Sequence, residues 1–109
     1  MPTKPETSYS RLNDLDRLIH EPARLTIMAV LAGCKSADSD FLRNTTELTK
    51  GNLSAHTSKL EQAGYVQIVK GFRGKIPTTH YSLTKVGRKA LELYQVMMRE
   101  ALNKLDKTT

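Results

Sequence analysis

Hydrophobic residues near the start of the chain recur at intervals of three and four, which predicts helices. The first group predicts a short helix that ends near Ile19, and it consists of Leu12, Leu15, Leu18 and Ile19. Pro22 suits the first turn of a second helix, where its missing N–H costs no hydrogen bond. That helix extends to about Ala32 with Gly33 as its cap. It is apolar on nearly every side, which is typical of a helix buried on several faces.

A third helix is predicted after a polar loop that runs from Lys35 to Asp38. Either Asp38 or Ser39 can cap this helix, because both side chains accept hydrogen bonds from backbone N–H groups of the first turn. The helix should end near Leu48. It should direct three residues inward, namely Phe41, Leu42 and Thr45.

A fourth helix follows after a tight turn. Thr49 can cap it, residues 50–63 can form it, and Gly64 can stop it. Two short helices joined in this way, over about residues 39–63, are typical of a helix-turn-helix.

The pattern changes from helical to alternating after residue 64, which predicts a β-hairpin over about residues 65–83. The outgoing strand includes Tyr65, Val66, Ile68 and Val69. Turn-forming residues at its far end predict a long loop, and they are Gly71, Gly74 and Pro77. The returning strand alternates through Thr79, Tyr81 and Leu83.

Thr84 can cap a last helix over about residues 84–106, and two apolar rows run along it. One row is a heptad seam of Leu91, Tyr94, Met98, Ala101 and Leu105. The second row consists of Val86, Ala90, Leu93 and Met97. Both rows can pack on the first two helices of the same chain, or one can meet a second subunit. We favour a homodimer, because the apolar stripe is wider than one small domain needs to cover. The predicted interface is the heptad seam together with Leu12 and Leu15.

The composition fits one small domain of mainly α structure with a β-hairpin, over residues 11–109, after a flexible leader at residues 1–10. Its single cysteine excludes an intramolecular disulfide and a zinc site with several cysteines. The longest apolar run, residues 27–32, is far too short to cross a bilayer, and no signal peptide is evident. We therefore expect a cytoplasmic protein with no membrane partner.

The positive charge of the chain is concentrated in one stretch. The net charge is +6, and residues 65–89 alone contain six basic residues and no acidic residue. They are Lys70, Arg73, Lys75, Lys85, Arg88 and Lys89. A local field of one sign attracts polyanions, although a solvated basic face is the simpler explanation.

The fourth helix has an inner and an outer face. Successive residues turn by 100°, so Leu53, Thr57 and Leu60 share the inner face. The outer face is small and polar: Ala55, Ser58, Lys59 and Gln62 form it, and Asn52, Ser54 and His56 flank it. Such a helix can enter the major groove of DNA, which is about 12 Å wide, and bond to base edges. An ordinary amphipathic helix that merely faces water has the same pattern.

The sequence resembles that of small winged-helix regulators of the ArsR/MarR type. The resemblance rests on the run from Thr49 to Val66 (TKGNLSAHTSKLEQAGYV), and three shorter segments add to it. These are His20–Arg24, Gly71–Lys75 and Leu83–Arg88. It covers most of the chain, from about Leu18 to Leu93. It implies a winged helix that binds a two-fold DNA operator as a dimer, usually as a repressor.

The resemblance also implies which residues lie near double-stranded DNA. On the recognition helix these are Lys50, Asn52, Ser54, Ala55, His56, Ser58 and Lys59. On the wing they are Arg73 and Lys75, to which the basic stretch adds Lys70. Thr57 departs from the family pattern, which has an apolar leucine there. We expect its hydroxyl to bond back to a helix carbonyl.

The residues that enzymes and metal sites need are missing. His20, His56 and His80 are far apart, and no cysteine or histidine pair has metal-ligand spacing. No nucleophile elbow, phosphate-binding glycine loop or carboxylate pair is present, so we predict no catalytic residue, metal or cofactor. The predicted function is that of a homodimeric DNA-binding transcriptional regulator, with no effector identified by the sequence. The alternative is a winged-helix interaction module whose basic wing binds an acidic protein.

Overall fold

A computed structural model of the chain describes residues 10–107. The predicted leader therefore lies almost wholly outside the described residues. Along the chain the elements are a 3₁₀-helix η1 (Ser10–Asp14), α1 (Pro22–Ala32), β1 (Ala37–Asp38), α2 (Ser39–Thr46), α3 (Lys50–Gln62), β2 (Val66–Arg73), β3 (Ile76–Leu83) and α4 (Lys85–Lys107).

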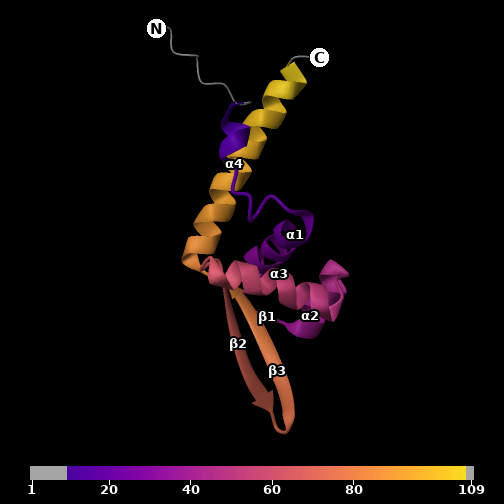
Figure 1. The fold of residues 1–109 in the computed structure, drawn as a ribbon. Helices are drawn as coiled ribbons and strands as arrows, with labels where there is room; N and C mark the ends of the chain where they lie inside the picture. The colour runs from indigo at the N-terminus through magenta and orange to yellow at the C-terminus, as the bar shows by residue number, and fades with distance from the viewer. Residues whose placement is uncertain (1–9, 108–109) are drawn as a thin grey trace.

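The elements are arranged along one long axis (Figure 1). Helices α1, α2 and α3 pack together in the middle, the hairpin of β2 and β3 extends to one side, and α4 extends to the other. The principal extents are 66 × 28 × 22 Å. The two projections from the central helices are thus at opposite ends of the molecule.

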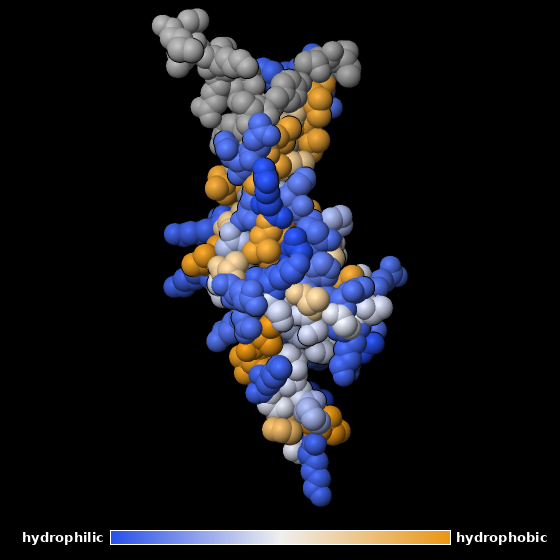
Figure 2. All heavy atoms as spheres, viewed as in Figure 1, coloured by the Kyte–Doolittle hydropathy of each residue, from blue (hydrophilic) through white to orange (hydrophobic). Residues whose placement is uncertain are grey.

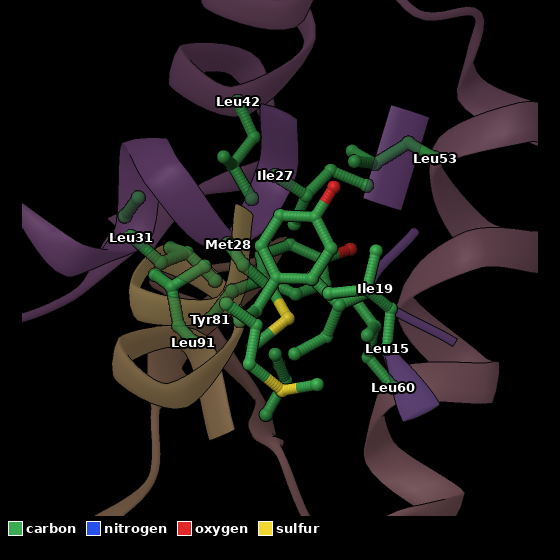
Figure 3. Close-up of a cluster of buried hydrophobic side chains, with 14 residues drawn as sticks. Leu15, Ile19, Ile27, Met28, Leu31, Leu42, Leu53, Leu60, Tyr81 and Leu91 are labelled. Atoms are coloured by element: carbon green, nitrogen blue, oxygen red, sulfur yellow. The ribbon is translucent and has the colours of Figure 1, made fainter. Parts of the chain in front are cut away.

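The core lies where the three central helices meet the base of α4 and the sheet (Figure 3). Its fully buried hydrophobic side chains come from α1 (Ile27, Met28, Leu31), α2 (Leu42), α3 (Leu53, Leu60), β2 (Val66) and the segment before α1 (Ile19). The predicted helix-turn-helix is therefore present and is held by its hydrophobic inner faces. Burial of each such side chain stabilises the fold by about 1.5–3 kcal/mol.

Local capping explains the helix boundaries. The Glu21 carboxylate accepts hydrogen bonds at the start of α1, and Asp38 does so at the start of α2. Thr49 accepts from the backbone N–H of Asn52 at 3.1 Å and begins α3, which ends within one residue of the predicted position before Gly64. The α3 and α4 boundaries were predictable because such caps use neighbouring residues only.

The segment before α1 is not the predicted helix through Ile19. After η1 the chain turns, because the Asp16 carboxylate accepts from the backbone N–H groups of Leu18 (2.9 Å) and Ile19 (3.2 Å). An aspartate side chain that bonds to nearby N–H groups competes with helical hydrogen bonds. Leu15 and Ile19 are nevertheless buried.

The prediction that Phe41 and Thr45 point inward from α2 is wrong. Phe41 is 46% exposed and Thr45 is exposed, whereas Leu42 is fully buried. The short helix thus directs a narrow apolar face toward α1. The loop expected before α2 also contains a short strand, β1, which pairs with Tyr81 and His80 of β3.

The sheet is antiparallel in the order β1-β3-β2. Pairing of β2 with β3 runs from Val66 opposite Leu83 to Arg73 opposite Ile76, so the predicted long loop at residues 71–77 is wrong. The turn is only Gly74 and Lys75, with Gly74 at a left-handed φ of 63°. A proline, Pro77, is tolerated in β3 because β1 ends opposite His80 and leaves one edge of β3 unpaired there.

Helix α4 begins where predicted, after the cap Thr84, whose hydroxyl accepts from the N–H of Gly87 at 2.9 Å. Its buried side chains are Leu91, Tyr94, Met97 and Ala101. The two predicted rows are therefore not separated as expected. The buried face contains three of the five heptad residues, Leu91, Tyr94 and Ala101, and one residue of the second row, Met97. No helix among the described residues is long and apolar enough to cross a membrane.

Candidate nucleic-acid interface

The outer face of α3 is open to solvent. Asn52, Ala55 and Lys59 are all exposed, as are Lys50 and Ser54. On the opposite face Leu53, Thr57 and Leu60 are at most 2% exposed, so the helix packs on the core by that face. Of the residues that the resemblance placed near DNA, these five are thus accessible, while His56 and Ser58 are partly buried.

Thr57 is the polar residue on the buried face of α3. Its hydroxyl donates to the carbonyl of Leu53 at 2.7 Å and lies 3.2 Å from that of Ser54. The predicted bond back to a helix carbonyl is confirmed. Because the hydroxyl has a partner, its burial does not leave an unsatisfied polar group in the core.

A groove with a volume of about 830 Å³ lies between α3 and the hairpin. From α3 it is lined by Lys50, Ser54, Ser58 and Glu61, and from β2 by Lys70 and Arg73. Further lining residues come from α2 and its cap (Asp38, Asp40, Arg43) and from β3 (Thr78, Thr79, His80). The structure therefore brings three predicted residues of α3 and two of the wing to one concave surface, whereas Asn52, Ala55, His56, Lys59 and Lys75 do not line it. Hydroxyl groups and cations there can bond to phosphate oxygens.

His56 takes a different position from the one predicted. Its Nδ1 lies 3.2 Å from the Nη1 of Arg24 in α1, and its side chain is only 23% exposed. A guanidinium group has donors only, so Nδ1 accepts in this contact. The same Nδ1 lies 3.7 Å from the Glu21 carboxylate. His56 therefore links α3 to α1 rather than projecting freely from the outer face.

Arg24 and Glu21 complete this contact. The Nε of Arg24 donates to the carbonyl of Leu18 at 2.6 Å, and its Nη1 lies 3.8 Å from the Glu21 carboxylate. Burial by itself raises the pKa of Glu21, but N–H bonds from Arg24 and Ala23 and the charges of His56 and Arg24 lower it below its ordinary value. The ionised carboxylate thus holds the guanidinium that contacts the recognition helix.

The hairpin places its cations at the far end of the molecule. Lys70, Arg73 and Lys75 are all exposed, and Lys75 is in the turn itself. Figure 2 shows blue side chains around the end of the hairpin, next to orange ones. The wing is a narrow cationic ribbon, as its charge predicted, although it is more regular than its glycines suggested.

Sequence reasoning missed several residues of this surface. Arg24 and Arg43 come from other helices, and only the packing of α1 and α2 on α3 brings them near the groove or His56. Thr78 and Thr79 of β3 also line the groove. They were not among the predicted site residues, although Thr79 was expected in the returning strand. Among residues 10–107 no three histidine, cysteine or acidic side chains gather in a way that could hold a metal ion.

Residues 23–102 match the sequence model of the family described as "Winged helix DNA-binding domain". The chain belongs to this winged-helix family. It is 32% identical over 79 residues to an uncharacterized protein of Methanocaldococcus jannaschii, a match that covers 72% of this chain and 85% of that protein. The winged helix described above is thus supported by sequence as well as by shape.

Solved structures with the same fold include transcriptional regulators. A transcriptional regulator homologue from Pyrococcus horikoshii superposes with a TM-score of 0.83 at 25% identity, over 89% of this chain and 98% of that one. The transcriptional repressor CouR, bound to a 23-mer DNA duplex, superposes with a TM-score of 0.65 at 17% identity, over 89% of this chain and 73% of that one. MarR-family regulators are among the structural neighbours, so the chain has the winged-helix architecture of MarR-type transcriptional regulators.

Proposed function

We propose that this winged-helix protein binds double-stranded DNA with sequence specificity, as a homodimer, and represses transcription. The observation that carries the proposal is the free polar face of α3 beside the cationic hairpin. Each feature alone occurs on many proteins. Together, on neighbouring elements of a winged helix, they fit a nucleic-acid duplex.

The proposed reading element is α3. Its 13 residues make a rod of roughly 20 Å at 1.5 Å per residue, long enough to lie across a major groove. Asn52 and Lys59 can bond to base edges, and the small Ala55 lets the helix approach closely. His56 connects α3 to α1 through its contact with Arg24.

The proposed backbone contacts come from the hairpin. Lys70, Arg73 and Lys75 contribute positive charge without an acidic residue anywhere in residues 65–89. Contacts of this kind release counterions, so binding should weaken steeply with salt. The groove also contains three acidic residues, Asp38, Asp40 and Glu61. Their carboxylates repel phosphates, so we expect the duplex to contact the exposed rim of the groove rather than its floor.

We assign the dimer interface to α4, but the residues that can form it differ from the predicted set. Leu15, Leu91, Tyr94 and Ala101 are already buried within their own chain, which leaves Leu12, Met98 and Leu105 of the predicted interface with accessible surface. The other exposed apolar side chains of α4 are Val86 (59%), Leu93 (57%), Val96 (43%) and Leu102 (53%). Helices with such exposed residues bury them against a partner, and a two-fold pair is the commonest arrangement.

A selection of bound duplexes from a random pool tests the proposal most directly. We expect enrichment of an inverted repeat with half-sites about 34 Å apart, one helical turn, or a multiple of that distance. Asn52→Ala combined with Lys59→Ala should remove the sequence preference and retain weak binding to any duplex. Failure of the wild type to bind any duplex, together with tight binding to an acidic protein, would instead favour an interaction module.

A pair of charge variants separates the wing from charge in general. Lys75→Ala removes one cation from the hairpin turn, and Lys104→Ala removes one from the last turn of α4, at the other end of the molecule. We expect Lys75→Ala to make the negative slope of log affinity against log salt shallower by about 1. Lys104→Ala should leave that slope unchanged. Equal effects would show that only net charge matters.

A further inference from the structure

The sheet has one long edge that is free to pair. Strand β2 is the last in the order β1-β3-β2, and it pairs with β3 along all eight of its residues, whereas no strand within residues 10–107 pairs with its outer side (Figure 1). Free edges are usually protected by proline, a bulge or short length. Strand β2 contains no proline, and its register with β3 is uninterrupted. Its outer backbone groups are therefore available to another strand.

The pairing shows which backbone groups of β2 point away from β3. A turn of two residues closes on a hydrogen-bonded pair, here Arg73 with Ile76. Bonded and non-bonded pairs alternate along antiparallel strands, so Phe72 and Pro77 form a non-bonded pair, which suits a residue without an N–H. The N–H and C=O groups directed to the free edge are therefore those of every second residue: Ile68, Lys70 and Phe72.

The side chains along this edge are apolar and cationic. Val69 is 52% exposed and Phe72 is 75% exposed, and neither belongs to the core. Lys70 and Arg73 alternate with them, and residues 65–89 contain no acidic residue. Like charges that face each other destabilise a strand pair, so a second copy of β2 is a poor partner for this edge. A strand with acidic and apolar residues matches both features.

We propose that the free edge of β2 accepts an extended acidic segment of a partner protein as a fourth strand of the sheet. In strand addition, main-chain hydrogen bonds provide affinity and alternate side chains provide specificity. An antiparallel segment would place acidic residues opposite Arg73 and Lys70, and apolar residues opposite Phe72 and Val69. From its N-terminus, the partner motif is thus acidic, apolar, any residue, acidic, apolar. This binding goes beyond the proposed function and requires no DNA.

Amide hydrogen exchange tests the geometry of the added strand. The isotope-labelled full-length protein is mixed with the peptide GDVTEVTG, which contains the motif, and exchange is followed at each residue by NMR. We expect saturating peptide to slow exchange of the N–H groups of Ile68, Lys70 and Phe72 by roughly tenfold or more. The N–H groups of Val69 and Gly71 are the internal control, because they already face β3 and should change much less. Failure of the peptide to bind, or binding that protects none of the three outer N–H groups, would overturn the proposal.

Matched peptides and variants separate strand pairing from charge alone. In GDPTEVTG, a proline replaces the valine that would face Phe72, which removes one main-chain donor and keeps the charge. Lys70→Pro and Lys70→Ala both remove the cation, but only the proline also removes an N–H from the free edge. We expect the proline member of each pair to bind roughly tenfold more weakly by fluorescence anisotropy.

Equal affinities within the peptide pair would show that charge alone holds the peptide, and would overturn the proposal. Equal affinities of the two Lys70 variants, once circular dichroism confirms that both are folded, would do the same. Neither assay contains DNA, so failure of this proposal would leave the proposed function untouched. Absence of duplex binding would likewise leave strand addition untouched.

Discussion

The substitution Gly87→Ala tests the junction between the wing and α4. A Cβ at Gly87 would lie 2.2 Å from the carbonyl oxygen of Tyr65 and 2.9 Å from its carbonyl carbon. To reach even 3.0 Å, that oxygen must move by about 0.8 Å, and it accepts the N–H of Thr84 at 3.0 Å. The same junction is fixed by the Thr84 hydroxyl, which donates to the carbonyl of Gly64 at 2.6 Å. Backbone on both sides limits relaxation.

The expected effect follows from two opposing contributions. Replacing glycine by alanine within a helix is ordinarily stabilising by about 0.5–1 kcal/mol. Overpacking against a rigid neighbour costs about 1–3 kcal/mol. The difference between these ranges is about 0–2.5 kcal/mol. Because the clash is with backbone rather than a flexible side chain, we expect the upper part, a loss of about 1–2.5 kcal/mol of unfolding free energy, or about 4–20 °C in Tm for a domain of this size.

Gly51→Ala is the matched control for this experiment. It is the same change in the first turn of another helix, α3, where nothing lies within 4 Å of the added methyl group. It should raise stability by up to about 1 kcal/mol. Both variants are compared with the wild type by urea denaturation at one protein concentration, because self-association would make stability concentration-dependent. If Gly87→Ala proved as stable as the wild type, the close packing of α4 against Tyr65 would be disproved.

Three further predictions concern the cap, the exposed face and the N-terminal segment. Thr84→Ala removes the cap of α4 and should cost about 0.5–2 kcal/mol in urea denaturation; no loss would show that the cap is dispensable. Leu93→Lys with Leu102→Lys should shift sedimentation toward the monomer mass at unchanged circular dichroism, and a dimer that persists would locate the interface elsewhere. The Tyr65 hydroxyl donates to Asp16, and this bond, with burial, raises the pKa of Tyr65 from 10 to about 12. The stability that this bond provides is complete below pH 10 and is lost as the pH rises toward 12. The urea midpoints of the wild type and the Tyr65→Phe variant should therefore converge over that interval. A difference between the midpoints that stays constant would exclude the bond.

Much of the helix-turn-helix could be predicted because its determinants are close together in sequence. Thr49 bonds to Asn52, three residues away, and the turn after α3 uses a left-handed glycine, Gly64. The apolar spacing of Leu53 and Leu60 fixed which face of α3 is buried, and therefore which polar residues are free. Such signals survive in the sequence because they depend on helical geometry alone.

The wing shows where local signals mislead. Gly71 and Pro77 are frequent in turns, yet both lie within strands here. Pairing along the whole hairpin outweighs their individual preferences, and the unpaired edge of β3 accommodates the proline. The exposed positions of Phe72 and Ile76 follow from that register, so they could not be assigned while the segment was expected to be a loop.

The sequence by itself determined the elements that depend on short-range geometry: the caps, the buried face of α3 and the cationic hairpin. Only the tertiary structure decided the rest, because those features join residues that are far apart along the chain. Arg24 turns His56 inward from across the helix-turn-helix, and Tyr65 binds Asp16 in the segment that was expected to be a helix. Packing of η1 and α1 against α4 likewise selects which of its apolar residues are buried and which remain for a partner, a choice that a periodic stripe leaves open.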